Sequence, residues 1–476
     1  MTSRILQFHE HESIIAFAQT ATGKVLLWIA GCALLAWHDV NALMFVAFTL
    51  VLLLPERRRS LLMLVAFGLL VGKFLPKQFF DLPELPGILD TIGLNRWLQF
   101  LGSFAVAAVS ILAIIVAAIR FDRLPAIVRR HPLLILNLLV WLALVLGSMP
   151  RLQVFALAPF LLWRASYLFK SAAAGRTANT SLKDHLFYMV PVFGGSNTPY
   201  GKGPDYLGRC EATGPVSMAR SQLAGIKLLG LAVVWMFALA LMDAVIFGRT
   251  DTMFATALAS WSLNLPAVTD LMLAKTNPAI AIGWAGVYLE LIRAVVRLAI
   301  WGHVIIGCLR LLGFNVFRNT YKPLFAQSIV EFWNRFFFYF KELLVDFFFY
   351  PAFYRSGWAA PRLRLFLAIF AAAFVGNVYF HVLREHELLF ADDLPALLTF
   401  WCPRLIYCAL LVLGIWLSML RQQERRKTAA RASGLSRLRA IAGVWTFYGL
   451  IHLWLVAPYQ VGVGRRLDFL KSLIGL

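Results

Sequence analysis

Long apolar runs recur along the chain, and they constrain its fold more than any other feature. Runs of about 18 or more apolar residues are typical of helices that cross a bilayer. Backbone N–H and C=O groups in lipid need partners within the protein, and a helix supplies them within one segment. The clearest runs occupy residues 97–119, 224–247, 284–312, 363–383 and 397–420.

Shorter or interrupted runs raise the expected number of helices. Together with the clear runs they predict an all-α, polytopic transmembrane helical bundle of about 11–12 spanning or partial helices. Only 14% of the 476 residues are charged, whereas about a quarter are charged in a soluble domain. We therefore expect a single integral membrane domain over residues 1–476. The shorter runs occupy residues 24–37, 41–55, 60–76, 133–149, 152–170, 326–350 and 438–458.

Two segments depart from this pattern. Residues 1–20 lack the apolar core of a signal peptide, and their apolar side chains fit one face of a short interfacial helix. Residues 171–223 are rich in Gly and Pro, which favour turns and irregular backbone. Their Tyr, Phe and Val content argues against disorder. We expect an irregular, packed loop near one mouth of the bundle.

The net charge of +21 comes from Lys and Arg that gather in short connections between the apolar runs. This distribution follows the positive-inside rule and favours contact with anionic lipid. We therefore expect membrane lipid, and no nucleic acid, as the partner of these charges. The basic segment 421–439 predicts a cytoplasmic loop. The five cysteines show no metal-binding or redox spacing, so no metal site and no bound cofactor are expected.

The segment 311–355 differs from an ordinary span. Its first part is polar, and its second part is rich in aromatic residues up to Pro351. The next apolar run contains a lone histidine, His381. An ionisable side chain within a span usually faces the protein interior or a watery cavity. These features predict a reaction chamber inside a membrane protein.

Four pieces of residues 310–385 carry a family resemblance. They are RLLGF at Arg310–Phe314, then Asn319 and Pro323 followed by SIVEFWNRF at Ser328–Phe336, then Asp346 with Pro351, and finally His381. In this order and spacing they resemble the motifs of the membrane-bound O-acyltransferase (MBOAT) family, and most closely its bacterial branch that acylates envelope glycans.

This resemblance implies a function. The expected enzyme moves an acetyl or other short acyl group from an acyl-CoA or acyl-carrier thioester, as co-substrate, to a hydroxyl of an envelope polysaccharide or another secreted or lipidic acceptor. It implies a central chamber, a location in the bacterial cytoplasmic (inner) membrane and envelope-biosynthesis proteins as partners. The chain departs from the family at Phe337, where the bacterial members usually have a second histidine, and at Phe380 and Val382 around His381, where they usually have W-H-G.

His381 is the main catalytic candidate. An imidazole with an ordinary pKa near 6.5 accepts a proton at neutral pH, and acyl transfer to a hydroxyl needs such a base. The alternative is a histidine that hydrogen-bonds a neighbouring helix. Asn377 lies one helical turn earlier, where it would orient the ring or donate to an oxyanion.

The other candidate residues each have a structural alternative. Asp346, which the resemblance makes a supporting residue, needs a partner if it is buried. Asn334 and Arg335 follow Trp333, and Arg335 would either bind a phosphate or pair with Glu331, four residues before it.

Aromatic side chains and a second histidine complete the predicted site. Aromatic residues that follow the motif either line an apolar acyl channel or simply pack together. His303 shares its apolar run with Glu290, Arg293 and Arg297, which are expected on one helix face as ion pairs or as a donor site. His303 would serve in place of the histidine missing at position 337. The predicted chamber-lining residues are Trp333, Phe336, Phe337 and Tyr339.

Two other functions fit a polytopic chain. A transporter or flippase of an amphiphile would use the charges of the 284–312 run, but it predicts internal repeats, and the two halves of the sequence differ in length and pattern. A non-catalytic MBOAT homologue would explain Phe337. The hypothesis of an O-acyltransferase depends on His381.

Overall fold

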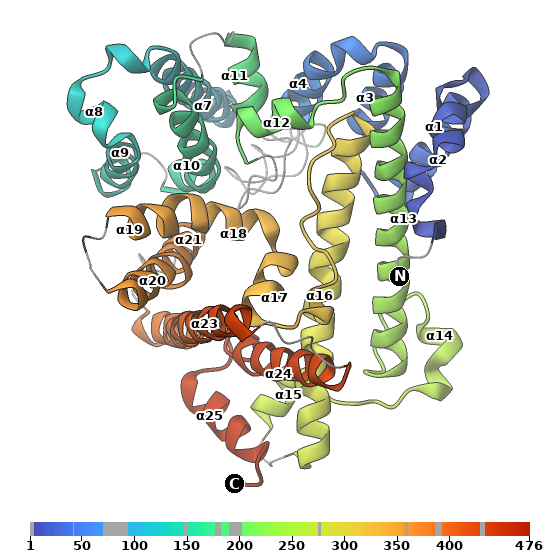
Figure 1. The fold of residues 1–476 in the computed structure, drawn as a ribbon, viewed down its shortest axis with the longest axis vertical. Helices are drawn as coiled ribbons and strands as arrows, with labels where there is room; N and C mark the ends of the chain where they lie inside the picture. The colour runs from blue at the N-terminus through green and yellow to red at the C-terminus, as the bar shows by residue number, and fades with distance from the viewer. Residues whose placement is uncertain are drawn as a thin grey trace. The chain divides into compact units, whose positions relative to one another are not determined.

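The computed structural model describes residues 4–40, 42–69, 94–146, 151–176, 182–189, 202–274, 278–355, 357, 360–385, 393–428 and 434–476. The regular structure of these residues is helical (Figure 1), with one isolated bridge between Glu211 and Phe314. The predicted all-α class is confirmed for this part of the chain. By their internal contacts, the residues form two compact units, one of Met1–Gly230 with Val304–Phe317 and one of Leu231–His303 with Arg318–Leu476.

The N-terminal elements belong to the first unit. They are η1 (Arg4–Glu10), α1 (Glu12–Gln19), α2 (Ala21–Trp37), α3 (Ala42–Leu53), η2 (Pro55–Arg57), α4 (Arg58–Leu69), α7 (Leu94–Ile119), η4 (Phe121–Arg123), α8 (Ala126–Arg130), α9 (Pro132–Leu146), α10 (Arg151–Ala173), α11 (Leu182–Met189) and α12 (Pro204–Cys210). The segment 171–223, expected to be irregular, thus contains two short helices, α11 and α12, in its described part. α12 begins at Pro204, because proline is suited to the first helical position.

The remaining elements include the two longest apolar helices and two π-helical segments, η7 and η8. They are α13 (Pro215–Val245), α14 (Ala255–Leu258), η5 (Ala259–Trp261), α15 (Val268–Leu273), α16 (Ile280–Leu311), η6 (Pro323–Phe325), α17 (Ile329–Phe336), α18 (Phe338–Leu344), η7 (Val345–Phe349), α19 (Tyr350–Arg355), α20 (Pro361–Phe370), η8 (Ala371–Gly376), α21 (Asn377–Arg384), α23 (Leu394–Thr428), α24 (Gly434–His452) and α25 (Val463–Ser472).

Within the described ranges, four helical segments are long and apolar enough to cross a membrane, and they indicate a helical membrane protein. α1 and α2 make a fifth segment if this pair, bent by 95°, counts as one span. The expected total of about 11–12 included partial helices, and some of the predicted runs do form shorter apolar helices, such as Ala42–Leu53. The four segments are Pro215–Val245, Ile280–Leu311, Pro361–Arg384 and Leu394–Gln422.

The predicted run 326–350 is divided in the structure at Phe337. Its backbone, with φ −140° and ψ 78°, is not helical and separates α17 from α18. The preceding loop supplies the hydrogen bonds that a continuous helix would have made. The N–H of Phe338 donates to the carbonyl of Asn319 (3.0 Å), and the Thr320 hydroxyl donates to the carbonyl of Phe336 (2.9 Å). Tertiary hydrogen bonds therefore stabilise a break that apolar periodicity does not reveal.

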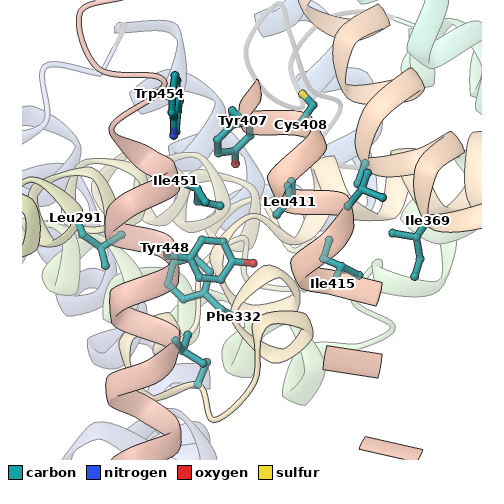
Figure 2. Close-up of a cluster of buried hydrophobic side chains, with 14 of the residues drawn as sticks. Leu291, Phe332, Ile369, Tyr407, Cys408, Leu411, Ile415, Tyr448, Ile451 and Trp454 are labelled. Atoms are coloured by element: carbon teal, nitrogen blue, oxygen red, sulfur yellow. The ribbon is translucent and has the colours of Figure 1, made fainter. Parts of the chain in front are cut away.

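The core of the second unit forms where α17 packs against α23 and α24 (Figure 2). The rings of Phe332 and Tyr448 stack with centroids 3.7 Å apart. The Tyr448 hydroxyl donates to the carbonyl of Ile329 (2.9 Å), and Trp445 Nε1 donates to the carbonyl of Leu324 (2.7 Å). These contacts fix the start of α17, the helix that carries the F-W-N-R part of the motif.

Arg58 and Arg59 lie in a basic connection between two apolar runs, and both have a structural role in the first unit. Arg59 forms ion pairs with Asp184 (2.6 Å) and Glu211 (2.5 Å), and Arg58 pairs with Glu211 (2.9 Å). The hydrogen bond to Glu211 raises the pKa of Arg59. These pairs join α4 to α11 and to the end of α12. The two arginines therefore stabilise the packing of these helices, in addition to any effect on the orientation of the chain in the membrane.

Candidate functional site

His381 lies in α21, at the end of the membrane-length segment Pro361–Arg384. Its side chain is half-buried, and Nδ1 is inaccessible to solvent and has no hydrogen-bond partner among the described residues. The ring of Phe380 meets the imidazole edge-on, with centroids 5.3 Å apart. Buried polar atoms in native proteins nearly always have partners, so an unpartnered one suggests a functional use.

Asn377 lies one turn before His381 on the same side of α21. Only 2% of the residue is exposed, and its Oδ1 is also buried without a hydrogen-bond partner. The two residues therefore place two unused hydrogen-bonding atoms on one side of a helix of the predicted site.

Two π-helical segments meet beside these residues. η7 carries Asp346, whose side chain is half-buried, and η8 ends at Gly376, directly before Asn377. The two segments pack against each other. Phe348 approaches so closely that a Cβ on Gly376 would lie 2.7 Å from its ring. π-helical turns are frequent at functional sites. The structure therefore brings Asp346 onto the element that supports the His381 helix.

A chain of ring contacts connects Phe337 with His381. The ring centroids of Phe337 and Phe340 are 5.5 Å apart, those of Phe340 and Phe380 are 4.6 Å apart, and Phe380 contacts His381. Trp333 also meets Phe340, at 6.1 Å. Position 337, where the resemblance led us to expect a second histidine, is therefore linked to His381 by two intervening rings.

The remaining predicted lining residues take part in packing. The rings of Phe332 and Phe336 lie 5.2 Å apart, and Tyr339 is 1% exposed. Phe336 is half-buried. These contacts agree with the packing alternative for Phe336 and Tyr339.

Arg335 forms the ion pair with Glu331 that was the alternative to a phosphate-binding role. Its Nη2 lies 2.5 Å from Glu331, and its Nη1 donates to the carbonyl of Lys322 (3.4 Å). Asn334 is exposed. The guanidinium of Arg335 thus contacts neighbours from its own helix and the loop before it.

The charged residues of α16 also form ion pairs. Arg293 is 2% exposed, and it pairs with Asp243 of α13 (3.1 Å) and with Glu290 (3.4 Å). His303 is buried, and its Nδ1 contacts the carbonyl of Ala299 in its own helix. The structure therefore connects Glu290 and Arg293 to a helix–helix contact, while Arg297 is exposed.

A polar cluster that the sequence analysis did not single out lies near the end of α21. Arg384 pairs with Glu385 (3.2 Å), and the Tyr459 hydroxyl donates to Glu385 (2.7 Å). Arg384 and Arg404 both act electrostatically on His381. The signal that could have revealed Arg404 is a charged residue inside an otherwise apolar run.

The second unit also contains a pocket of about 220 Å³ between α15 and α25. Its lining includes Leu271, Phe469 and Lys471, and none of the predicted site residues. The described residues contain no group of three His, Cys, Asp or Glu side chains that could hold a metal ion.

The comparisons with known proteins define no family. No protein-family model matches the chain, and no curated protein is significantly similar to it. The fold and the site define the class as a helical membrane protein with unpartnered polar atoms around a half-buried histidine.

Proposed function

We propose that this chain is a membrane-embedded O-acyltransferase. It moves an acetyl or other short acyl group from acyl-CoA or an acyl-carrier thioester to a hydroxyl of an envelope polysaccharide or another secreted or lipidic acceptor. One observation carries the proposal: the half-buried imidazole of His381 has a buried, unpartnered Nδ1 within a membrane-length helix. The resemblance of residues 310–385 to the MBOAT motifs supports it, and places the enzyme in the bacterial cytoplasmic membrane beside envelope-biosynthesis proteins.

The chemistry follows from the residues around the ring. His381 accepts the proton of the acceptor hydroxyl while the hydroxyl oxygen attacks the thioester carbonyl. The C–S bond then breaks, and the proton passes to the departing thiolate, so no further reagent is needed. Asn377 is on the side of α21 that allows its amide to donate to the transient oxyanion. Exclusion of water protects the thioester from hydrolysis.

The test is acyl transfer by the purified full-length protein with labelled acetyl-CoA and candidate hydroxyl acceptors. We expect His381→Ala to reduce transfer by at least about 100-fold, the usual contribution of a general base. The matched control is His38→Gln, because His38 lies in the first unit and hydrogen-bonds the carbonyl of Leu229 (3.0 Å). Transfer that persists unchanged in His381→Ala would exclude this mechanism.

The transporter hypothesis drew on the charges of α16. Arg293 has carboxylate partners in Asp243 and Glu290, which favours a role in helix packing. If the full-length protein in vesicles moved a labelled amphiphile across the vesicle membrane and transferred no acyl group, the result would favour the transporter.

A further inference from the structure

Arg404 is a buried arginine within the membrane-length segment Leu394–Gln422. It is 8% exposed, and its Nε and Nη1 are buried without hydrogen-bond partners. Its guanidinium lies over the ring of Phe400 at 4.2 Å, and Phe400 in turn packs against the ring of Tyr459 at 5.0 Å. Aromatic packing therefore holds the charged group in place and leaves the N–H groups of Nε and Nη1 unused.

Trp401 lies three residues before Arg404 on the same face of α23. It is also 8% exposed, and its indole Nε1 is buried without a partner. One helix face thus presents three buried N–H donors that lack acceptors within the described part of the chain. Because each unsatisfied buried donor destabilises the fold, this arrangement is explained if a ligand supplies the acceptors.

The nearest structural explanation is an ion pair between Arg404 and Glu385. Glu385 does act electrostatically on Arg404, but its carboxylate is engaged by Arg384 and by the Tyr459 hydroxyl. Within the described residues, Arg404 has no ion pair closer than 4 Å. Among the residues that the structure describes, the Nε and Nη1 donors of Arg404 therefore have no acceptor.

We propose that Arg404 and Trp401 bind an oxyanion, a carboxylate or a phosphate, carried by the substrate that reacts at His381. α21, which carries His381, packs against α23, which carries Arg404, and the guanidinium acts electrostatically on the imidazole. The proposal therefore assigns the anionic group and the reacting group to one site. The planar guanidinium fork binds two oxygens of such a group at once, and the indole N–H adds a third hydrogen bond. The identity of the reacting group rests on the proposed acyl transfer, whereas the anion site does not.

The test is calorimetric binding of two matched probe pairs to the full-length protein in detergent. 4′-Phosphopantetheine against pantetheine represents the donor, and cellobiouronic acid against cellobiose represents an acidic glycan acceptor. In the wild-type protein we expect the anionic member of one pair to bind more tightly than its neutral counterpart. We expect Arg404→Met to remove about 10- to 100-fold of that preference and to leave the binding of the neutral member unchanged. The pair affected identifies the substrate that carries the anion.

Three further variants sharpen the result. Arg364→Met is the matched control, since the Arg364 guanidinium also lies over a ring, that of Phe353 at 4.7 Å, and should leave the preference unchanged. Arg404→Lys keeps the charge without the planar fork, and should retain part of it. Trp401→Phe keeps the ring, and should lose about 3- to 10-fold, which also tests the site if Arg404→Met fails to fold.

Two outcomes overturn the anion site: a wild-type protein without anion preference for either pair, or a preference that survives both Arg404→Met and Trp401→Phe. The proposed function fails separately. Anion preference that depends on Arg404, in a protein that transfers no acyl group, supports the site and refutes the transferase. Acyl transfer that depends on His381, in a protein without anion preference, supports the transferase and refutes the anion site.

Discussion

The absence of a side chain at Gly376 permits the close contact of η7 with η8. A Cβ at this position would lie 2.7 Å from the Phe348 ring and 2.9 Å from a methyl group of Leu344. We expect Gly376→Ala to destabilise the protein by about 1–3 kcal/mol, because overpacking forces neighbours away from their preferred positions. Activity should fall as well, since Asn377 and His381 follow directly. Thermal unfolding in detergent and an acyl-transfer assay measure the two effects.

Gly443→Ala is the control for this change. Gly443 lies inside α24, and a Cβ there would meet no atom within 4 Å. Alanine in an open helical position should stabilise by about 0.5–1 kcal/mol through its higher helix propensity. Equal effects of the two substitutions would contradict the close-contact interpretation.

His185 in α11 is expected to make the first unit sensitive to acid. Burial lowers the pKa of His185 from its ordinary value of 6.5, although the neighbouring Asp184 opposes this. Below pH 6.5 the unfolded chain therefore binds more protons than the folded one. Stability is fully present above that pH and is lost as the pH falls. Stability should therefore fall between pH 7.5 and 5.5, with an upper limit of about 1.4 kcal/mol per pH unit for one histidine.

Thermal unfolding at both pH values checks this expectation, with His185→Gln as the comparison. Glutamine does not titrate, so the variant should lose less stability on acidification than the wild type. The same acid dependence in both proteins would assign it to other groups.

At the scale of elements, an ion-pair cluster joins α13 and α16. Arg293, which lies between Asp243 and Glu290, also faces the ring of Phe247 at 4.7 Å. Removing one member of a buried cluster is costly because it leaves charge uncompensated. We expect Arg293→Met to destabilise by about 3–5 kcal/mol, since the buried Asp243 and the partly buried Glu290 would lose the cation that pairs with both.

The triple variant Asp243→Asn, Glu290→Gln, Arg293→Met tests the cause. With no charge left in the cluster, most of the lost stability should return, because apolar or neutral replacements of buried ion clusters are often tolerated. Chemical or thermal unfolding of the single and triple variants provides the measurement. A triple variant less stable than Arg293→Met would show that packing, and not charge, dominates this contact.

The division at Phe337 shows where periodicity fails at this scale. The aromatic run on both sides of Phe337 has the composition of one helix, but Asn319 and Thr320 provide hydrogen bonds that stabilise two. Asn319 and Thr320 lie in the loop before the run, so the apolar pattern of the run itself does not reveal these hydrogen bonds. By contrast, α20 to α21 and α23 match their predicted runs because the apolar character of each is continuous.

At the scale of the whole molecule, the basic segment 421–439 predicts the orientation in the membrane. The protein should stay with the membrane after alkaline carbonate extraction, because its apolar helices are held by lipid. Arg437 is exposed at the start of α24. A cysteine introduced as Arg437→Cys should react with an impermeant maleimide in inverted inner-membrane vesicles and not in intact cells.

The parent protein serves as the labelling control, since its five cysteines are buried or partly buried. Reaction in intact cells would place this segment on the opposite side. Release of the protein by carbonate would reject the membrane assignment itself.

The candidate site was only partly accessible from the sequence. His381 and Asn377 could be predicted to share one side of a helix, because their spacing within a continuous apolar run is sufficient. Arg404 could not be linked to them, because its helix, α23, meets α21 only through tertiary packing. The ion pair of Arg335 with Glu331 could be predicted from the sequence because the two residues are four positions apart on one helix. The ion pair of Arg293 with Asp243 could not, because it joins helices that are far apart in the sequence.

The sequence by itself determined that the chain is helical and suited to a membrane, since apolar length and the need to satisfy backbone hydrogen bonds are properties of each segment alone. It also determined that His381 lies inside an apolar helix. Only the tertiary structure decided which polar atoms lack partners, where the helix at Phe337 breaks and which residues face His381. Those properties depend on which helices pack against one another, and the composition of a helix does not specify which other helix it contacts.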